Sequence, residues 1–372
     1  MSSFIYICNN FTGNKVHSET IYNLSKKYNN INHYIFVACN NKNLINKNII
    51  ESDNIFIEYI YIHKIFRFFP VIKSLILFCL IFLRGRKKCI KWNKAKILAY
   101  TFWSDGIIAL YFNLFFNTSF SVFVRVTDLS IFFKYAFYLK PLLYLISRKS
   151  KFIFFPSLVL KKYYSNYRIF KKDIVKRVFL PNSINQFWLD NVFYFNNLAK
   201  KNKKILFVGS FDKNKNLPAV LNSCMNLYSY RQDFTLEFIG GSVTSFKELC
   251  KINDIPEWVL VTEKLSDKQE LLTKYRESNI LLVPSFLETF GMVYLEAISQ
   301  GCFVIHSKDQ GIDYLFDNGF SYSINPFNIQ EISNLLNHLL DKNFQLDSSS
   351  LKNELNLFSS SEIIDLYSCF FD

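Results

Sequence analysis

Pro284-Ser-Phe-Leu-Glu-Thr-Phe-Gly-Met-Val-Tyr-Leu-Glu-Ala-Ile-Ser-Gln-Gly301 is the stretch from which the fold of this chain is best interpreted. It follows an apolar run, residues 280–283, of the kind found in buried parallel strands. From about Phe290 its apolar spacing becomes helical. The pattern therefore predicts a strand, a turn and a helix, with Glu288 on the turn at the carboxyl end of the strand.

Two carboxylates and the start of a helix are the candidate chemistry of this stretch. Seven residues separate Glu288 from Glu296, which is expected two turns into the helix, so both carboxylates can address one ligand. The backbone N–H groups of Gly291, Met292 and Val293 favour an anion such as a diphosphate. Carboxylates for hydroxyls and a helix start for phosphate favour a sugar nucleotide as the ligand.

The pattern Pro-Ser-x-x-Glu-x-Phe-Gly-x-x-x-Leu-Glu-Ala resembles the retaining glycosyltransferases of family 4, the glycosyl transferases group 1. The resemblance implies an α/β protein with the GT-B fold, in which two Rossmann-like domains with parallel sheets face each other across a central cleft. It also implies that Glu288 contacts the donor sugar during catalysis and that Glu296 contacts the nucleotide ribose. Phe290 is included in the donor site by the same resemblance. The alternative is a capped surface helix with two ordinary glutamates.

A second motif opens the C-terminal half. Residues 204–216 read as a strand that ends at Gly209, followed by a loop and a helix, and they resemble the family's Gly-Arg-x-x-x-x-Lys phosphate loop. Lys215 matches the lysine and is predicted to be catalytic. Ser210 stands in place of the arginine, so a hydroxyl donor replaces a bidentate guanidinium. Gly209 and Ser210 are predicted to bind the donor, and Lys213 is either a substitute charge or a solvated lysine.

The N-terminal half matches the family only in the order of its elements. Gly13 is the one glycine left where the family usually has a glycine pair, and it is kept as a donor-binding candidate beside the alternative of plain turn chemistry. Thr127 stands where many members have a histidine. Asp128 is a possible acid on the acceptor side, and a cap or turn residue is the alternative. His17 is interpreted as a surface helix residue.

The domain boundaries follow from Leu180-Pro-Asn-Ser-Ile184, which resembles the segment where the family's chain crosses to the second domain. We predict four parts: an N-terminal acceptor-side Rossmann-like domain at 1–181, a linker at 182–203, a C-terminal nucleotide-sugar-binding Rossmann-like domain at 204–355, and a C-terminal helix at 356–372 that packs back toward the first domain.

Charge is divided unevenly along the 372 residues. Residues 1–180 hold 28 Lys and Arg against 7 Asp and Glu, whereas residues 181–372 hold 16 against 23. The two halves therefore carry net charges of +21 and −7, within the +14 of the whole chain. Such asymmetry predicts that the first half faces a polyanion, either an anionic membrane or a nucleic acid.

A membrane surface is favoured over nucleic acid because the basic residues alternate with bulky apolar runs at 65–96 and 131–151, and no nucleic-acid motif is recognised. The uninterrupted apolar part, 74–83, is about half the length of a spanning helix. The eight cysteines are scattered and no secretory signal is evident, which predicts a reduced, cytoplasmic protein that is peripheral on the inner face of the cell membrane.

These patterns predict a retaining glycosyltransferase of the hexosyltransferase type, which moves a sugar from a nucleoside diphosphate to a lipid-linked or growing glycan acceptor in cell-surface polysaccharide synthesis, of lipopolysaccharide or capsule. No metal or other cofactor is expected, because no acid pair or His cluster with ligand spacing occurs. One alternative is a non-catalytic GT-B subunit that binds a partner or glycan, motivated by the missing glycine pair, histidine and arginine. The other is a nucleic-acid binder, motivated by the basic half.

Overall fold

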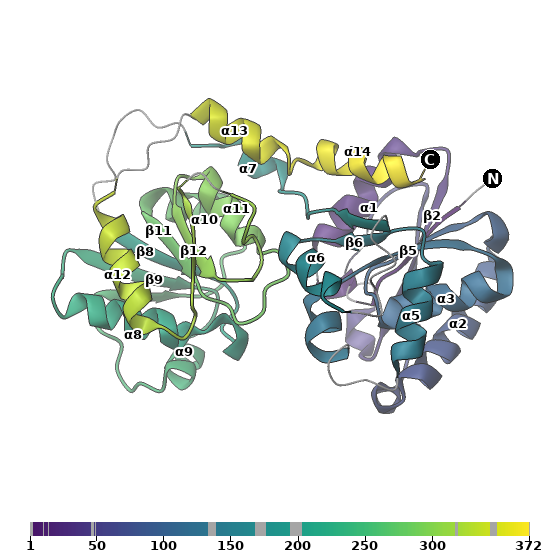
Figure 1. Cartoon of the computed structure of the whole chain (residues 1–372), viewed down its shortest axis with the longest axis horizontal. Helices are drawn as coiled ribbons and strands as arrows, with labels where there is room; N and C mark the ends of the chain where they lie inside the picture. Colours follow the sequence, from purple (N-terminus) through teal and green to yellow (C-terminus); the bar gives the residue numbers. More distant parts are fainter. Residues whose placement is uncertain are drawn as a thin grey trace. The chain divides into compact units, whose positions relative to one another are not determined.

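Two parallel β-sheets, one in each of two units of the chain, organise the computed structural model (Figure 1). The first unit comprises Met1–Ser183 and Ser360–Asp372, and the second comprises Ile184–Ser359. The structure describes residues 3–9, 11–13, 15–45, 48, 50–132, 139–167, 176–193, 203–316, 319–342 and 348–371.

The sheet of the first unit has seven described strands in the order β3-β2-β1-β4-β5-β6-β7, and every recorded pairing is parallel. Alternate residues of β1 face opposite sides, so that Ile5 and Ile7 enter one core and Phe4 and Tyr6 the other. Both faces are thus buried, as expected for a parallel sheet. The strands are β1 Ser3–Ile7, β2 Asn32–Cys39, β3 Ile55–Tyr61, β4 Lys96–Ala99, β5 Ser119–Phe123, β6 Ile153–Phe155 and β7 Arg177–Phe179.

Helices cover both faces of this sheet (Figure 1). Apolar side chains of α2, α3 and α5 form the core on one face, and those of α1 and α14 form the core on the other. The helices of the first unit are α1 Lys15–Lys27, α2 Pro70–Lys87, α3 Ser104–Phe116, α5 Lys140–Lys149, α6 Leu158–Ser165 and α14 Ser360–Phe371, with shorter turns at η1 Phe11–Gly13, η2 Lys42–Leu44, η3 Lys64–Phe68, η4 Trp92–Lys94 and η5 Asp128–Phe132.

The second unit repeats this plan with six described strands in the order β10-β9-β8-β11-β12-β13, again parallel in every recorded pairing. The strands are β8 Lys203–Val208, β9 Phe234–Ile239, β10 Val259–Thr262, β11 Ile280–Val283, β12 Phe303–Ser307 and β13 Ser321–Ile324. The helices are α7 Gln186–Asp190, α8 Leu217–Tyr228, α9 Val243–Cys250, α10 Lys268–Glu277, α11 Met292–Ser299, α12 Ile329–Leu340 and α13 Ser348–Asn356, with a turn at η8 Lys213–Lys215.

The units divide within the predicted linker, but part of that linker is core. Residues 184–193 belong to the second unit, where Trp188 and Leu189 of α7 are buried in its apolar core. The rest of the predicted linker, up to residue 202, lies outside the described residues. The segment predicted as one C-terminal helix contains the last residue of α13 and then α14, and Lys27 of α1 pairs with Asp365 of α14 at 2.6 Å.

Among the helices that the structure describes, none combines the length and the apolar character needed to cross a bilayer. The uninterrupted apolar run at 74–83 lies within α2, which follows η3 directly.

Candidate donor site

The order of strands in the second sheet reverses between β8 and β11. From β8 the chain moves outward through β9 and β10, and from β11 it moves the other way through β12 and β13. Ligands of open α/β sheets bind beside the carboxyl ends of the strands at such a reversal. Lys215 follows β8 and Glu288 follows β11, so both predicted catalytic residues lie at this position.

Glu288 and Lys215 form an ion pair there, since Lys215 Nζ donates to Glu288 Oε2 at 2.7 Å. Both side chains are mostly buried, with 15% and 18% of their surface exposed. The backbone of Glu288 is fixed from the next loop, because its N–H donates to Gln310 Oε1 at 2.9 Å and its carbonyl accepts from the N–H of Gly311 at 3.0 Å. The carboxylate is therefore presented from a rigid turn.

Asn214 joins the two loops that carry this pair. Its side-chain oxygen accepts from the N–H of Leu287 at 2.9 Å, and its side-chain nitrogen donates to the Leu287 carbonyl at 2.9 Å. Asp212 caps η8 by accepting from the N–H groups of Asn214 and Lys215. The sequence analysis missed these positioning residues, although Asp and Asn directly after a strand are typical turn-forming residues.

Gly209 and Ser210 lie on the same loop as Lys215. A Cβ on Gly209 would lie 3.6 Å from the Lys215 side chain, so this glycine lies beside the lysine stem. Ser210 is exposed, and its hydroxyl donates to Asp212 at 2.6 Å. Gly240, which directly follows β9, comes so close that a Cβ there would clash with the Gly209 carbonyl oxygen. The sequence analysis did not select Gly240, although a Gly-Gly pair directly after an apolar run indicates a turn.

The start of α11 lies next to Glu288. Gly291 has a φ of +83°, and a Cβ there would meet the Tyr294 ring and lie 3.2 Å from Cγ of Glu288. The N-cap residue of α11 is Gly291, which has no side chain to cap the first N–H groups of the helix, and Met292 and Val293 are half-buried. Phe290 is buried against Phe358 in the apolar core, so its aromatic ring is a packing group.

Glu296 has a different environment from Glu288. It lies on α11 and accepts a hydrogen bond from the Tyr275 hydroxyl at 3.2 Å. Burial raises the pKa of Glu296 to about 7, although hydrogen bonds from Tyr275 and Trp188 and the charge of Lys268 act in the opposite direction. Tyr275 and Trp188 were not selected from the sequence, because their approach to Glu296 depends on how α7 and α10 pack.

The candidates of the first unit do not gather in the same way. Gly13 ends η1, and Thr127 is exposed after β5. Asp128 is buried and accepts from the N–H groups of Phe102 and Trp103, both at 3.1 Å, and from that of Arg125 at 2.8 Å. Burial raises the pKa of Asp128 to about 6 despite these hydrogen bonds. The structure therefore favours the alternative of a cap over that of an acceptor-side acid.

His17 is not the surface residue that we predicted. It is buried on α1, packs against the tilted ring of Tyr100 at 4.5 Å between ring centroids, and lies 3.3 Å from the Arg125 guanidinium. Burial, and then the charge of Arg125, lowers its pKa well below the usual value. The contact with Arg125 joins residues 108 positions apart, which explains why the local pattern could not reveal it.

A resident metal would need several ligating side chains in one place. Among the residues that the structure describes, no group of three His, Cys, Asp or Glu side chains is suited to a metal ion. That the reaction needs no metal stays a prediction.

Comparison with known proteins agrees with this geometry. Residues 190–354, most of the second unit, match the family model "Glycosyl transferases group 1". A relative from Klebsiella pneumoniae, described as an uncharacterized 41.2 kDa protein in the cps region, is 32% identical over 128 residues. That match spans 34% of this chain and 33% of the relative, so it covers about a third of either protein.

Solved structures match over the whole chain. Sucrose-phosphate synthase from Thermosynechococcus elongatus has a TM-score of 0.75 at 16% identity and covers 100% of this chain and 99% of its own. A UDP-forming trehalose-phosphate synthase from Burkholderia xenovorans has a TM-score of 0.72 at 10% identity, and the match covers 99% of this chain and 98% of the synthase. A glycosyltransferase from Rickettsia africae has 0.67 at 14%, with coverages of 100% and 97%. Residues 190–354 are thus similar to the group 1 glycosyltransferases, and the chain, with its two parallel-sheet units, has the GT-B fold.

Proposed function

We propose that the protein is a retaining glycosyltransferase of the hexosyltransferase type that moves a sugar from a nucleoside diphosphate to a hydroxyl of a lipid-linked or growing glycan. The observation that carries this proposal is the ion pair of Lys215 and Glu288 at the strand-order reversal, beside the uncapped start of α11. A cation, a carboxylate and free backbone N–H groups are the donors and acceptors that a sugar diphosphate requires.

The reaction breaks the bond between the anomeric carbon and the oxygen of the β-phosphate, and it forms a bond from that carbon to the acceptor oxygen on the same face. The acceptor's proton passes to the departing phosphate oxygen, so no separate side-chain base is required. Lys215, the Ser210 hydroxyl and the N–H groups at Gly291 and Met292 stabilise the charge of the leaving diphosphate. Glu288 orients the transferred sugar and Glu296 the ribose.

The helix α2 exposes an apolar face in addition to the one that it buries. Its buried face contributes Leu77, Phe78 and Ile81 to the core. Its opposite face exposes an apolar stripe at helical spacing, made of Ile72, Leu75, Cys79 and Leu83, of which Ile72, Leu75 and Leu83 are each about half exposed. Only one of these two apolar faces packs in the core, so the other face is available for a contact outside the unit.

Neighbouring side chains extend this stripe into what we call the α2 surface, defined by the exposed apolar residues Ile65, Phe68, Phe69, Val71, Ile72, Leu75, Leu83, Leu114 and Phe115. The exposed Arg86 and Lys87 at the end of α2 supply positive charge. Apolar side chains flanked by basic ones are complementary to an anionic lipid surface. We infer that the protein works at the cytoplasmic face of the membrane through this surface.

The cps-region relative supports a role in cell-surface polysaccharide synthesis, of capsule or lipopolysaccharide. The decisive experiment incubates the purified full-length protein with UDP-, GDP- and other sugar nucleotides and measures nucleotide release and the anomeric configuration of the product. We expect one donor to be consumed with retention, and Glu288→Gln to lower kcat while the exposed Glu270→Gln on α10 leaves it unchanged. Turnover of no donor by the wild type, or equal turnover by wild type and Glu288→Gln, would favour the non-catalytic subunit.

A further inference from the structure

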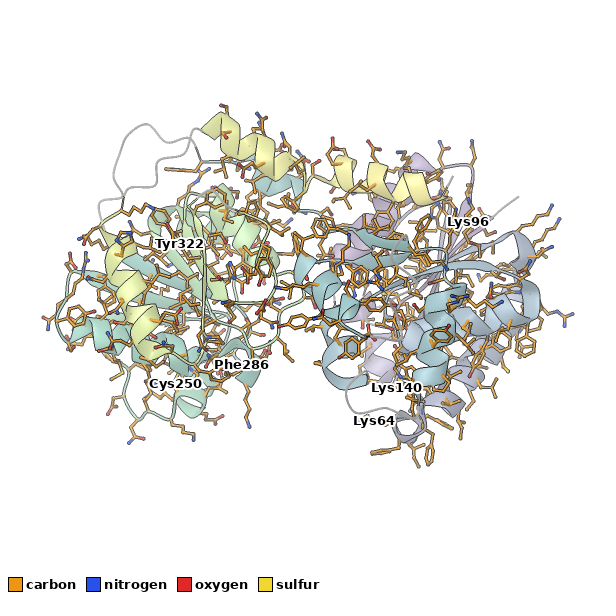
Figure 2. All side chains as sticks on the ribbon, in the orientation of Figure 1. Lys64, Lys96, Lys140, Cys250, Phe286 and Tyr322 are labelled. Atoms are coloured by element: carbon orange, nitrogen blue, oxygen red, sulfur yellow. The ribbon has the colours of Figure 1, made fainter. Side chains whose placement is uncertain are left out.

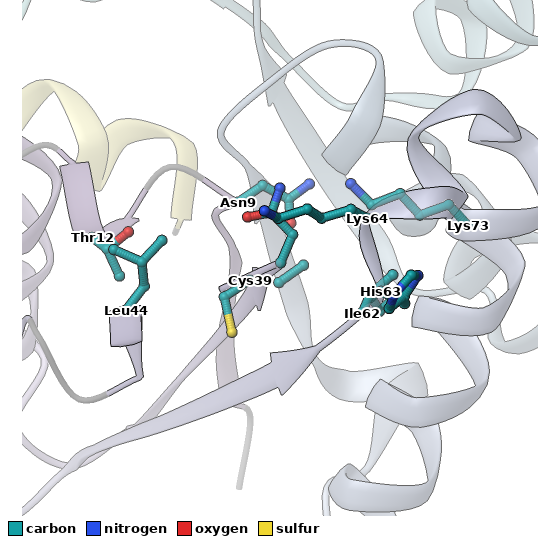
Figure 3. Close-up of a pocket in the computed structure, with 10 residues that line it drawn as sticks. Asn9, Thr12, Cys39, Leu44, Ile62, His63, Lys64 and Lys73 are labelled. Atoms are coloured by element: carbon teal, nitrogen blue, oxygen red, sulfur yellow. The ribbon is translucent and has the colours of Figure 1, made fainter. Parts of the chain in front are cut away.

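A pocket of about 220 Å³ opens in the first unit at the carboxyl ends of β1, β2 and β3 (Figure 3). Asn9 and Thr12 reach it from the segment after β1, Asn40 from that after β2, and Lys64 and Lys73 from η3 and the first turns of α2. This is the edge of the sheet opposite Lys96, where β4 begins (Figure 2). Small-molecule pockets are typically ~300–1,000 Å³, so this one suits a compact polar group.

The lining is cationic and rich in hydrogen-bond donors. The side chains of Lys64 and Lys73 extend toward Asn9 (Figure 3), and no Asp or Glu lines the pocket. In the described part of the chain, neither amine forms an ion pair. The amides of Asn9 and Asn40 and the Thr12 hydroxyl add neutral donors. Two unpaired cations with such donors match a phosphate better than an uncharged sugar.

Asn9 gives a second, independent indication of a ligand. Its side-chain oxygen is buried and has no hydrogen-bond partner among the described residues. A buried acceptor without a partner destabilises the fold unless a ligand donates a hydrogen bond to it. Its backbone N–H is bonded to the buried Asp105 at the start of α3. Burial raises the pKa of Asp105 to about 7, and the charge of Lys73 acts in the opposite direction. Asn9 is thus positioned to accept from a hydroxyl next to the two lysines.

We propose that this pocket binds the phosphate or diphosphate group of a phosphorylated sugar acceptor, with Lys64 and Lys73 on the phosphate oxygens and Asn9 on a sugar hydroxyl. This proposal rests on the proposed glycosyltransferase function and names the class of its acceptor. The proposed function places the donor diphosphate at Lys215 and α11 of the second unit, so we assign this anion site of the first unit to the other substrate; a raised donor KM in the pocket variant would instead assign it to the donor, as the candidate Gly13 on the loop after β1 implies. The phosphate belongs either to a lipid-linked sugar diphosphate or to a soluble sugar phosphate.

The test compares Lys64→Met/Lys73→Met with the matched pair Lys91→Met/Lys94→Met, which removes two exposed lysines near the start of β4 in the same unit. In the Lys215→Met background, which weakens the donor site, pyrophosphate binding is measured by calorimetry at low salt. We expect the pocket pair to weaken binding at least tenfold and the control pair to leave it within twofold. Equal binding by both pairs, or equal loss in both, would overturn the proposal.

Transfer assays with Lys215 intact then identify the source of the phosphate. One arm offers soluble sugar phosphates and the other polyprenyl diphosphate sugars in vesicles. In whichever arm is active, the pocket pair should raise the acceptor KM at least tenfold while the donor KM and donor hydrolysis stay unchanged. An unchanged acceptor KM overturns the pocket, whereas absence of donor turnover in every protein overturns the proposed function and leaves the calorimetric result to judge the pocket.

Discussion

Glu288 and Glu296 stand on the same strand-turn-helix segment, but their surroundings give them different chemistry. Glu288 is paired with Lys215 at 2.7 Å and is fixed through its backbone by Gln310 and Gly311. Glu296 forms no ion pair within 4 Å among the residues that the structure describes, and burial raises its pKa to about 7. Two carboxylates whose environments differ in this way are suited to different roles.

Glu296 should make nucleotide binding depend on pH. The carboxylate accepts two ribose hydroxyls only when it is ionised, so we expect the affinity for the nucleoside diphosphate to rise as the pH rises through about 7. Glu296→Gln should bind more weakly and lose this rise. Calorimetry from about pH 5.5 to 8.5 measures the affinity of both proteins. The nucleotide phosphate titrates in the same range, so the contribution of Glu296 is the difference between the two affinity curves. Parallel curves would contradict the ribose role.

The same pKa shift predicts a change in folding stability. A carboxyl whose pKa is raised by folding contributes stability below its ordinary pKa near 4.5, and this contribution is lost as the pH rises through about 7. In Glu296→Gln, the free energy of unfolding should therefore fall less between pH 4.5 and pH 7 than in the wild type. Urea unfolding at several pH values measures this difference. A steeper fall in the variant would show that the carboxyl is not buried as described.

Lys215 should contribute mainly to the transition state. Lys215→Ala should cost about 2–4 kcal/mol in kcat/KM, the scale of losing one preorganised group that stabilises developing charge. Its neighbour Lys213 is exposed on the same turn, so Lys213→Ala is the matched control and should stay near wild type. Ser210→Arg should be tolerated, because Ser210 is exposed, and the same assay measures its kcat/KM. Intact rate and nucleotide binding in Lys215→Ala would mean that this loop does not hold the phosphates.

At the scale of the elements, local periodicity and motifs predict individual strands and helices and the residues at their ends. The apolar run at 280–283 is β11, and the helix predicted from about Phe290 is α11, which begins at Met292. The motif residues Lys215 and Glu288 meet because they follow neighbouring parallel strands. Asn214, Gln310 and Tyr275 were missed because their contacts join segments that meet only when the sheet assembles.

The helix α2 shows where pattern alone was ambiguous. Apolar residues occur all round this segment, so their spacing does not distinguish a buried helix from an amphipathic helix that lies on a surface. The structure shows both features in one helix, with Leu77 and Phe78 in the core and Ile72 and Leu75 exposed. Its basic end is also less free than the sequence implied, since Arg84 and Lys88 pair with Glu58 at 3.0 and 2.9 Å.

The α2 surface should determine lipid binding through apolar contact. The triple variant Ile72→Ser/Leu75→Ser/Leu83→Ser removes three half-exposed side chains, each worth about 1 kcal/mol if lipid buries it, so vesicle binding should weaken at least tenfold. The matched control is Val243→Ser/Leu260→Ser/Leu357→Ser, which changes three exposed apolar residues of the second unit. Sedimentation with vesicles at high salt measures the apolar contribution to binding, because salt screens the charged contribution. Equal binding by both triple variants would remove the α2 surface from the membrane contact.

At the scale of the whole molecule, the two halves of the chain differ more in charge than in fold. Each unit is a parallel sheet covered by helices, yet residues 1–180 carry +21 and residues 181–372 carry −7. Fold alone does not require such a difference, because net charge acts on solubility and association rather than on the choice of fold. We therefore expect a polyanionic partner for the basic half, and the exposed apolar residues of α2 favour lipid over nucleic acid in this proposal.

The charge contribution is separable from the apolar one by salt. We expect the wild-type protein to sediment with anionic vesicles at low salt, to bind them less at high salt because the Debye length shortens, and to bind neutral vesicles weakly. Arg86→Ser/Lys87→Ser should lose about 1 kcal/mol per charge at low salt, whereas Lys213→Ser/Lys264→Ser in the acidic half should bind like the wild type. Equal binding to both vesicle types would contradict electrostatic docking. Binding to DNA or RNA that is tighter than to vesicles, and equally sensitive to salt, would instead make nucleic acid the partner of the basic half.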